Sequence, residues 1–412
     1  MRTFLNSCSG QVSVVFAVCF FALASLIGAA VTLSMDSRAA QELQHTADSA
    51  ALGGATAFVT SGKLRLEDRI NAATTQAESL ALRNSEFVLK NLKTVGSSED
   101  SYGQHLQLEV ELEFQSANPM AGLIKRNANV EVRRKAIAEA TRGFPLCVLM
   151  LADDSRGLYM KSKATLRADD CVIWSNSKDI GSLNFSRGEA TAKAFCSAGG
   201  YRETMGTVSP KPETKCRTLP DPLAGYEIPN TGPCDYQNKK FKHNKTYRLK
   251  PGVYCGDLRI RGQRATLDPG VYVVRDGRLG IDVREKVIAD GVTFLLEGTN
   301  YGVDIRGQGI SLTAPSTGPT AGMAIAQNGD LTIANKDAHI SGKFDLTGVI
   351  YLPQHDLALR QQGGGSQKSH YIQMVVNRLV LRETSVLDIE FDPAKTDLPV
   401  LIKPERSARL VQ

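Results

Sequence analysis

Six of the eight cysteines fall in one stretch in the middle of the 412-residue chain, so thiols are the first candidate reactive groups. The six are Cys147, Cys171, Cys196, Cys216, Cys234 and Cys255. Their spacings of about 18 to 25 residues contain no CxxC pair, so a zinc site is not expected. An even set of cysteines beyond an apolar N-terminal segment indicates disulfides formed in an oxidising compartment such as a periplasm. The sequence leaves the connectivity open, and buried free thiols are the alternative.

Aspartates are the second candidate group, because enzymes that cleave polysaccharides can gather carboxylates on one outer face of a stacked β fold. The aspartates of the C-terminal part are Asp257, Asp276, Asp282, Asp290, Asp304, Asp330, Asp345 and Asp356. Several stand beside a glycine, as in Asp276-Gly277 and Asp290-Gly291, where turn formation accounts for them. We therefore name no catalytic residue, and a membrane-tethered polysaccharide lyase or hydrolase is the alternative function.

A row of basic residues follows equivalent apolar positions. If Ile260, Ile281, Ile305, Leu359 and Leu381 stack inward, the residues after them point outward one above another, with Ala334 interrupting the row. This basic strip consists of Arg261, Asp282, Arg306, Arg360 and Arg382. A strand spacing of about 4.8 Å would place Asp282 between two guanidinium groups. We hypothesise that the basic strip contacts an acidic partner, either an assembly protein or an anionic cell-envelope polymer, and a solvated surface ladder is the alternative.

Metal, cofactor and nucleic-acid chemistry are not expected. Residues 151–157 begin like the Asp-x-Ser-x-Ser metal site of von Willebrand A domains, but Gly157 replaces the second serine. The six histidines lie far apart, and the glycines at 363–365 lack the Lys-Ser/Thr ending of a phosphate loop. A net charge of +6 is well short of that of a dedicated nucleic-acid binder. We predict no metal, no cofactor and no enzymatic activity.

The elements that position these groups begin with an apolar run. Residues 12–33 carry no charge and reach the length of about 20 residues with which a helix crosses a bilayer. We expect an uncleaved signal-anchor, with a cleaved signal peptide as the alternative, because a signal-peptide core has only about 7 to 15 apolar residues. Ala24, Gly28 and Thr32 repeat the small-residue spacing that lets membrane helices approach closely, although any Ala-rich span shows such spacing by chance.

Periodicity predicts a small α+β unit after the apolar run. Residues 34–60 continue the helix with a stripe of small side chains, and residues 63–93 form a second helical stretch. Residues 105–114 alternate between apolar and polar, which is typical of a strand with one buried face, and residues 130–140 form a further strand.

The C-terminal part has the clearest repeat in the chain. Strands such as Gly270-Val271-Tyr272-Val273 alternate with strands such as Leu279-Gly280-Ile281, and Gly-rich turns separate them. A repeat of about 20 to 28 residues with almost no helical periodicity predicts a parallel β-helix. A β-sandwich is the alternative, although Asn-Gly hairpin signals are scarce. The proline-rich residues 197–250 predict an irregular region stapled by cysteines.

Two sets of residues resemble the TadG-like proteins of the Tad/Flp pilus system. The N-terminal set is residues 10–16, 28–31, 41–44 and 48–52, and the later set is residues 147–149, Cys171, residues 221–224, 252–256 and 268–273. Thr32 stands where members often carry an aspartate, and Val15 stands where a processed pilin would carry a glutamate, so peptidase processing is not expected. The resemblance implies an inner-membrane anchor with a periplasmic domain, associated with the secretion and anchoring of adhesive fibres, and no catalysis.

We therefore predict an N-terminal transmembrane helix with an α+β membrane-proximal region, followed by an all-β right-handed parallel β-helix. The expected parts are a cytoplasmic stub and signal-anchor at 1–33, an α+β stalk at 34–145, a cysteine-containing irregular region at 146–250, a β-helix at 251–395 and a C-terminal tail at 396–412. The resemblance implies a single-pass inner-membrane protein with most of its chain in the periplasm, whose partners are other Tad/Flp assembly proteins or pseudopilins.

Overall fold

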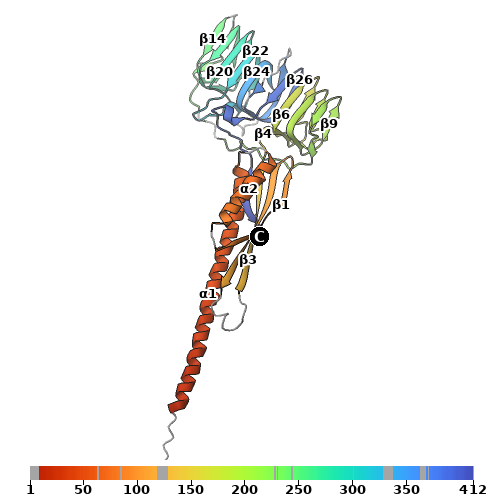
Figure 1. Cartoon of the computed structure of the whole chain (residues 1–412). Helices are drawn as coiled ribbons and strands as arrows, with labels where there is room; N and C mark the ends of the chain where they lie inside the picture. Colours follow the sequence, from red (N-terminus) through yellow and green to blue (C-terminus); the bar gives the residue numbers. More distant parts are fainter. Residues whose placement is uncertain are drawn as a thin grey trace, which may run out of the picture. The chain divides into compact units, whose positions relative to one another are not determined.

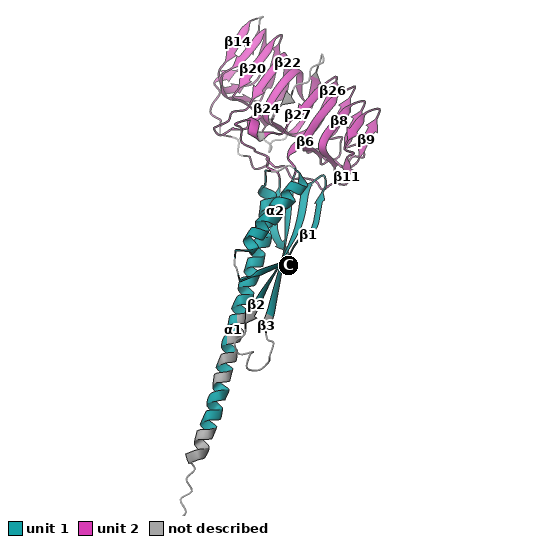
Figure 2. Ribbon diagram, in the orientation of Figure 1, with its two compact units in different colours: residues 1–143, 405–412 teal, residues 144–404 magenta. Residues whose placement is uncertain are grey.

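The computed structural model divides the chain into two compact units, residues 1–143 with 405–412 and residues 144–404 (Figure 2). The structure describes residues 9–62, 65–83, 86–117, 129–226, 229, 231–242, 245–299, 301–327, 337–361, 368–369 and 371–411. Most of the elements are strands, and the large sheet of the second unit is parallel, as the repeat predicted.

In the first unit two helices cover one face of a four-stranded antiparallel sheet (Figure 1). Its elements are α1 (Ser9–Thr60), α2 (Leu66–Ala81), β1 (Val88–Glu99), β2 (Gly103–Ala117), β3 (Asn129–Gly143) and β28 (Arg406–Val411), and the strand order is β1-β2-β3-β28. The expected C-terminal tail therefore ends in a strand of this sheet. The helix expected over 34–60 and the strands expected over 105–114 and 130–140 are confirmed.

The helix expected over residues 63–93 was wrong in its last part, where β1 begins. Leu89 and Leu92 are three residues apart, which is a helical spacing. A β-bulge after Leu89 nevertheless brings both onto one face of β1, since their partners are Leu112 and Val110 of β2. The bulge therefore gives two residues on one face of a strand the three-residue spacing that is typical of a helix.

Small side chains let α1 approach the sheet closely. Its buried face consists of Leu43, Ala47, Ala50, Ala51, Ala55, Phe58 and Val59. It packs against the alternate residues Leu106, Leu108, Val110 and Leu112 of β2. A β-carbon at Gly54 would lie 2.5 Å from Cδ2 of Leu108 and 2.8 Å from the carbonyl oxygen of Ala73, so only glycine fits this contact.

The opposite face of the sheet carries ion pairs across the strands. Glu109 lies 3.1 Å from Nζ of Lys93 on β1 and 2.5 Å from Nζ of Lys135 on β3. The side chain of Glu109 is only 5% exposed because these neighbours cover it. The hydrogen bond from Lys135 is the main reason why the pKa of Glu109 is lowered. These contacts link three strands on the face away from the helices.

The apolar segment expected to cross a membrane lies in α1. None of the helices, as far as their residues are described, combines the length and the apolar character that a membrane crossing requires. Between Val15 and Met35, α1 exposes ten large apolar side chains to between 54% and 73%: Val15, Phe16, Val18, Phe20, Phe21, Leu23, Leu26, Ile27, Val31 and Met35. The side chains of the expected packing face, Ala24, Gly28 and Thr32, lie outside the described residues.

The second unit is built from two segments of the chain. The first forms β4 (Leu146–Met150), β5 (Leu158–Lys161), β6 (Thr165–Ser175), β7 (Leu183–Ser186), β8 (Glu189–Ser197), β9 (Tyr201–Thr204), β10 (Thr207–Ser209) and β11 (Glu213–Thr214). The second begins with β12 (Tyr236–Gln237), β13 (Lys240–Phe241), β14 (Thr246–Leu249), β15 (Gly252–Cys255), β16 (Leu258–Gly262), β17 (Arg264–Leu267), β18 (Gly270–Arg275), β19 (Arg278–Val283) and β20 (Lys286–Asp290). It continues with β21 (Val292–Glu297), β22 (Gly302–Thr313), β23 (Met323–Gln327), β24 (Asp337–Gln361), β25 (Lys368–Ser369), β26 (Ile372–Glu383), β27 (Val386–Ile389) and a 3-10 helix at Pro393–Lys395.

From β12 to β19, each strand of the second segment pairs in parallel with the third strand after it, and from β20 onward the pairing is with the next but one or the next strand. Thus β15 pairs with β18, β16 with β19, and β17 with β20. Three strands and their connections form one layer, and the layers form what we call the β stack. All strand pairings within the described part of the stack are parallel, which the hairpins of a β-sandwich would not produce.

The chain enters the β stack in its middle. The late strand β26 pairs with the early strands β4 and β5, and β27 pairs with β6. From there the first segment builds layers toward β9, β10 and β11 at one end, while the second segment starts at the other end with β12, β13 and β14 (Figure 1). The region expected to be irregular, 146–250, therefore contributes strands to both ends of the stack.

Apolar residues and a row of aromatic rings fill the interior of the stack. The rings of Tyr236, Tyr254, Tyr272 and Phe294 lie one above another in successive layers, with centroid separations of 4.5, 6.1 and 5.8 Å. The hydroxyl of the buried Tyr272 donates to the carbonyl oxygens of Leu249 and Asp268. Buried rings with satisfied hydroxyls stabilise the stack without leaving polar atoms unpaired.

Residues 215–235 connect the two ends, and we call them the strap. The Asn176 side chain exchanges hydrogen bonds of 2.8 and 2.9 Å with the backbone of Leu219, and the Tyr351 hydroxyl donates to Asp221 over 2.9 Å. Farther along, Thr231 donates to Glu297 over 2.6 Å. These contacts meet the stack at Asn176 just after β6, at Tyr351 of β24 and at Glu297 of β21, so the described residues of the strap run along the stack.

The disulfides predicted from the cysteine count are confirmed. The pairs are Cys147–Cys171, Cys196–Cys216 and Cys234–Cys255. The first joins β4 to β6. The other two hold the ends of the strap: Cys196–Cys216 joins one end to β8, and Cys234–Cys255 joins the other end to β15.

Candidate functional site

The basic strip predicted from the sequence lies on the outer face of adjacent strands. Arg261 is in register with Asp282, and Asp282 with Arg306. Ser341 pairs with Arg306 on the far side and interrupts the row, whereas Ala334, expected there, lies outside the described residues. Arg360 and Arg382 form the second part of the row and are in register with each other.

The charges of the basic strip are only partly neutralised. Arg306 forms two hydrogen bonds of 2.8 and 2.9 Å with Asp304 of its own strand. Arg261 approaches Asp282 to only 3.8 Å. Arg382 is exposed to solvent. Burial lowers the pKa of His339, and the positive charge of Arg360 lowers it further. The strip therefore presents more positive than negative charge.

A second basic group, which the sequence analysis missed, lies at the end of the stack formed by β12–β14. Lys240, Phe241, Lys242, Lys245 and Tyr247 line an open pocket of about 540 Å³. Phe241 pairs with Ile260 of β16, and Lys242 and Arg261 are the residues that follow these two. We infer from this register that Lys242 extends the basic strip. The signal in the sequence is that residues 236–256 contain five lysines and no acidic residue.

Several aspartates of the stack hold turns together. Oδ1 of Asp257 accepts a hydrogen bond from the backbone of Arg278 over 3.0 Å, and Oδ1 of Asp276 accepts one from Thr299 over 3.1 Å. In each case the amide belongs to the following layer. Asp276 has a φ of 51°, which short polar residues in turns tolerate. Bonding of this kind accounts for these carboxylates without an acid–base role.

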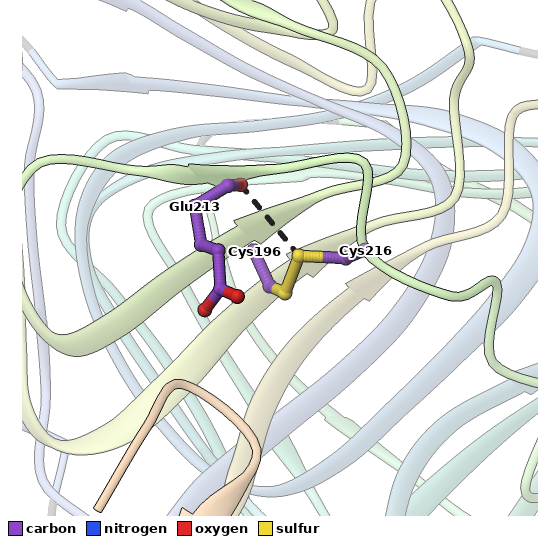
Figure 3. Close-up of side chains that lie close together, drawn as sticks. All are labelled: Cys196, Glu213 and Cys216. Atoms are coloured by element: carbon purple, nitrogen blue, oxygen red, sulfur yellow. Dashed lines mark hydrogen bonds between the residues drawn. A yellow bond between two sulfur atoms is a disulfide. The ribbon is translucent and has the colours of Figure 1, made fainter.

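One group of side chains has the composition of a metal site. Ligand atoms of Cys196, Glu213 and Cys216 lie within 4.8 Å of one another (Figure 3). The two sulfurs form a disulfide, so neither is a thiolate, and Sγ of Cys216 lies 3.6 Å from the Glu213 carbonyl oxygen. In the predicted Asp-x-Ser segment, the exposed Asp153 pairs with Lys178 over 3.2 Å.

A buried polar cluster lies where β21, β23 and β24 turn into the next strand. Tyr301 is 1% exposed, and Gln327 and His355 are fully buried. Nδ1 of His355 lies 2.6 Å from Oε1 of Gln327, whereas Nε2 of His355 and the hydroxyl of Tyr301 have no hydrogen-bond partner among the described residues. Burial lowers the pKa of His355 to about 4, so this imidazole is neutral at neutral pH.

Comparison with known proteins identifies the N-terminal part of the chain. Residues 10–57 match the family model described as "Putative Flp pilus-assembly TadE/G-like", so the predicted resemblance is confirmed there. The matched residues lie entirely within α1. No curated protein and no solved structure matches the chain.

Proposed function

We propose that this TadE/G-like chain is a membrane-anchored, non-catalytic structural component of a Tad/Flp-type adhesive pilus, with most of its residues outside the cytoplasm. The match of residues 10–57 carries this proposal, because it covers the helix from which the first unit is built. The pilus-related role follows from the family. The anchor, the compartment and the lack of catalysis are our inferences from the chain.

The contrast between the two parts of α1 supports the anchor. From Leu43 to Phe58 the helix buries its apolar side chains against a sheet. From Val15 to Met35 it exposes large apolar side chains, which is unfavourable in water by about 25 cal/mol per Å² of apolar surface and favourable in lipid. We infer a single-pass anchor in the inner membrane.

The second unit supports an extracytoplasmic location. Three disulfides in one unit are typical of oxidising compartments, so the periplasm is the inferred location. Parallel pairing between equivalent strands of successive layers supports a parallel β-helix, which offers a long lateral surface to partners. We infer the right hand from the usual chirality of connections between parallel strands. The inferred partners are other Tad/Flp assembly proteins or pseudopilins, with the basic strip as one contact surface.

The anchor is tested by placing charges in the exposed apolar part of α1. Leu26→Asp with Ile27→Asp adds two carboxylates, each costing about 2.5 to 3.5 kcal/mol at a bilayer centre. We expect this variant to leave the membrane fraction and fibres to fall to the level of a deletion strain. Gln41→Asp with Thr56→Asp, at exposed positions of the same helix, is the control that stays in the membrane. A charged variant that remains membrane-bound and assembles fibres would contradict the proposal.

Two further measurements test the remaining parts. Release of reducing ends from acidic polysaccharides by the purified full-length protein would establish the enzymatic alternative instead.

Arg306→Glu with Arg360→Glu reverses charge on the basic strip, and we expect fibre assembly to fall. Lys178→Glu with Lys403→Glu changes net charge equally at exposed positions away from the strip and should leave assembly intact. Normal assembly by the strip variant would remove the basic strip from the proposal.

A further inference from the structure

We propose that the end of the β stack formed by β12, β13 and β14 binds an anionic polysaccharide. The site goes beyond the proposed pilus role, since it requires only that the ligand share the compartment of the second unit. Its residues are Lys239, Lys240, Phe241, Lys242, Lys245 and Tyr247.

The first support is uncompensated positive charge. Lys239, Lys240, Lys242 and Lys245 are all exposed, and among the described residues none has a carboxylate partner. Cations one layer away behave differently. Arg259 pairs with Asp257 over 2.8 Å. Lysines held together without a carboxylate at ion-pair distance repel one another, and an anion bound between them relieves that repulsion.

The second support is the pair of aromatic walls. The rings of Phe241 and Tyr247 lie 5.2 Å apart at 60°, and both line the pocket. Nζ of Lys239 lies 5.9 Å from the centre of the Phe241 ring, so charge and ring face are presented together. The Tyr247 hydroxyl donates to the carbonyl oxygen of Lys242 over 2.9 Å, which fixes the ring against the lysine-bearing backbone.

These features fit an acidic sugar polymer. The C–H face of a sugar ring packs on an aromatic ring, and its carboxylate or phosphate group pairs with a lysine. The pocket volume of about 540 Å³ falls within the range of roughly 300–1,000 Å³ for small-ligand sites. Because the pocket is open, a polymer can continue past it toward Arg261 and the basic strip. The disulfides favour an envelope polymer over a nucleic acid as the occupant.

Protection of an open sheet edge is the competing explanation for the lysines. Charges on an end strand prevent another strand from pairing there. Edge protection works with either sign of charge, however, and needs no aromatic pocket. All the charged residues from 236 to 256 are basic, so protection alone does not account for them.

The test measures binding of the full-length protein in detergent to polygalacturonate, with neutral dextran as the comparison polymer. Lys240→Glu, Lys242→Glu and Lys245→Glu together keep charge on the edge but reverse its sign. We expect binding at low salt to weaken about tenfold or more, since each exposed ion pair is worth about 0.2–1 kcal/mol. Lys178→Glu, Lys343→Glu and Lys403→Glu form the control with the same net charge, and binding should change by less than about twofold.

A second set of variants tests the rings and guards against misfolding. Phe241→Leu and Tyr247→Leu keep apolar volume but remove the flat face, so affinity should fall several-fold with charge unchanged. If the triple glutamate variant lowers the melting temperature, the three lysines are replaced by glutamine instead. Equal loss of binding in the control triple variant, binding unaffected by the pocket variants, or stronger binding of single-stranded DNA than of polygalacturonate would overturn the proposal.

Discussion

Removing the Cys196–Cys216 disulfide tests how the strap holds the β stack together. This bond closes a loop with a sequence separation of 20 residues and fixes one end of the strap to β8. The chain entropy of a loop of that length corresponds to about 3 kcal/mol of stability. Both cysteines are replaced by alanine, because both are buried and a serine would leave a hydroxyl without a partner.

Two results are expected from the Cys196→Ala/Cys216→Ala variant. For a unit of this size about 1 kcal/mol shifts the melting temperature by roughly 2–4 °C, so the loss should be about 6–12 °C, followed by circular dichroism. Detachment of the strap also becomes easier. Trypsin cleavage after Lys215 or Arg217 should accelerate by up to about a hundredfold, since about 1.4 kcal/mol corresponds to tenfold and cleavage follows the opened population.

Cys147→Ala/Cys171→Ala is the matched control. Its loop has a sequence separation of 24 residues, so the entropic loss is nearly the same, but it joins β4 to β6 and does not hold the strap. The control should melt lower while cleavage after Lys215 and Arg217 stays slow. Equal cleavage of the two variants at these sites would refute the idea that the strap is held at its end.

Two more predictions concern the interior of each unit. Gly54→Val should destabilise the first unit by about 1–3 kcal/mol in urea unfolding, because its β-carbon meets Leu108 and the Ala73 carbonyl, whereas Gly62→Val, with open space around it, should have little effect. His355 has a pKa of about 4 when buried and 6.5 as an ordinary histidine, so the unfolded chain binds more protons between these values. The contribution of His355 to the free energy of unfolding should be complete above about pH 6.5. It should fall by up to about 3 kcal/mol as the pH drops to 4. Melting curves from pH 8 to pH 4 measure this loss, which His355→Gln should reduce; an unchanged pH dependence would contradict it.

Alternation and repetition in the sequence were sufficient to predict much of the local structure. The apolar residues of β2 alternate because one face of that strand packs on α1, and this burial is visible in the sequence itself. Stacking of the basic strip follows from the same regularity, since residues after equivalent inward positions point outward together. The β-bulge in β1 escaped prediction because it gives a strand the spacing of a helix.

Only part of the pocket at the end of the stack could be predicted from the sequence. A run of lysines without acidic residues is visible in the sequence, yet the run does not reveal that Phe241 and Tyr247 face one pocket. That arrangement depends on β13 and β14 lying at the end of the stack, where no further strand among the described residues pairs with them.

The sequence by itself determined the TadE/G-like helix, the presence of disulfides and the parallel strands, because each depends on residue types and spacing within short segments. Only the tertiary structure decided that β26 pairs with β4, that the chain therefore starts in the middle of the stack, and which cysteines join. The physical reason is that every layer offers the same backbone hydrogen-bonding edge and the same kind of apolar interior. The pattern of residues within one strand cannot distinguish among such edges. Which two strands pair is decided by the packing of the whole chain.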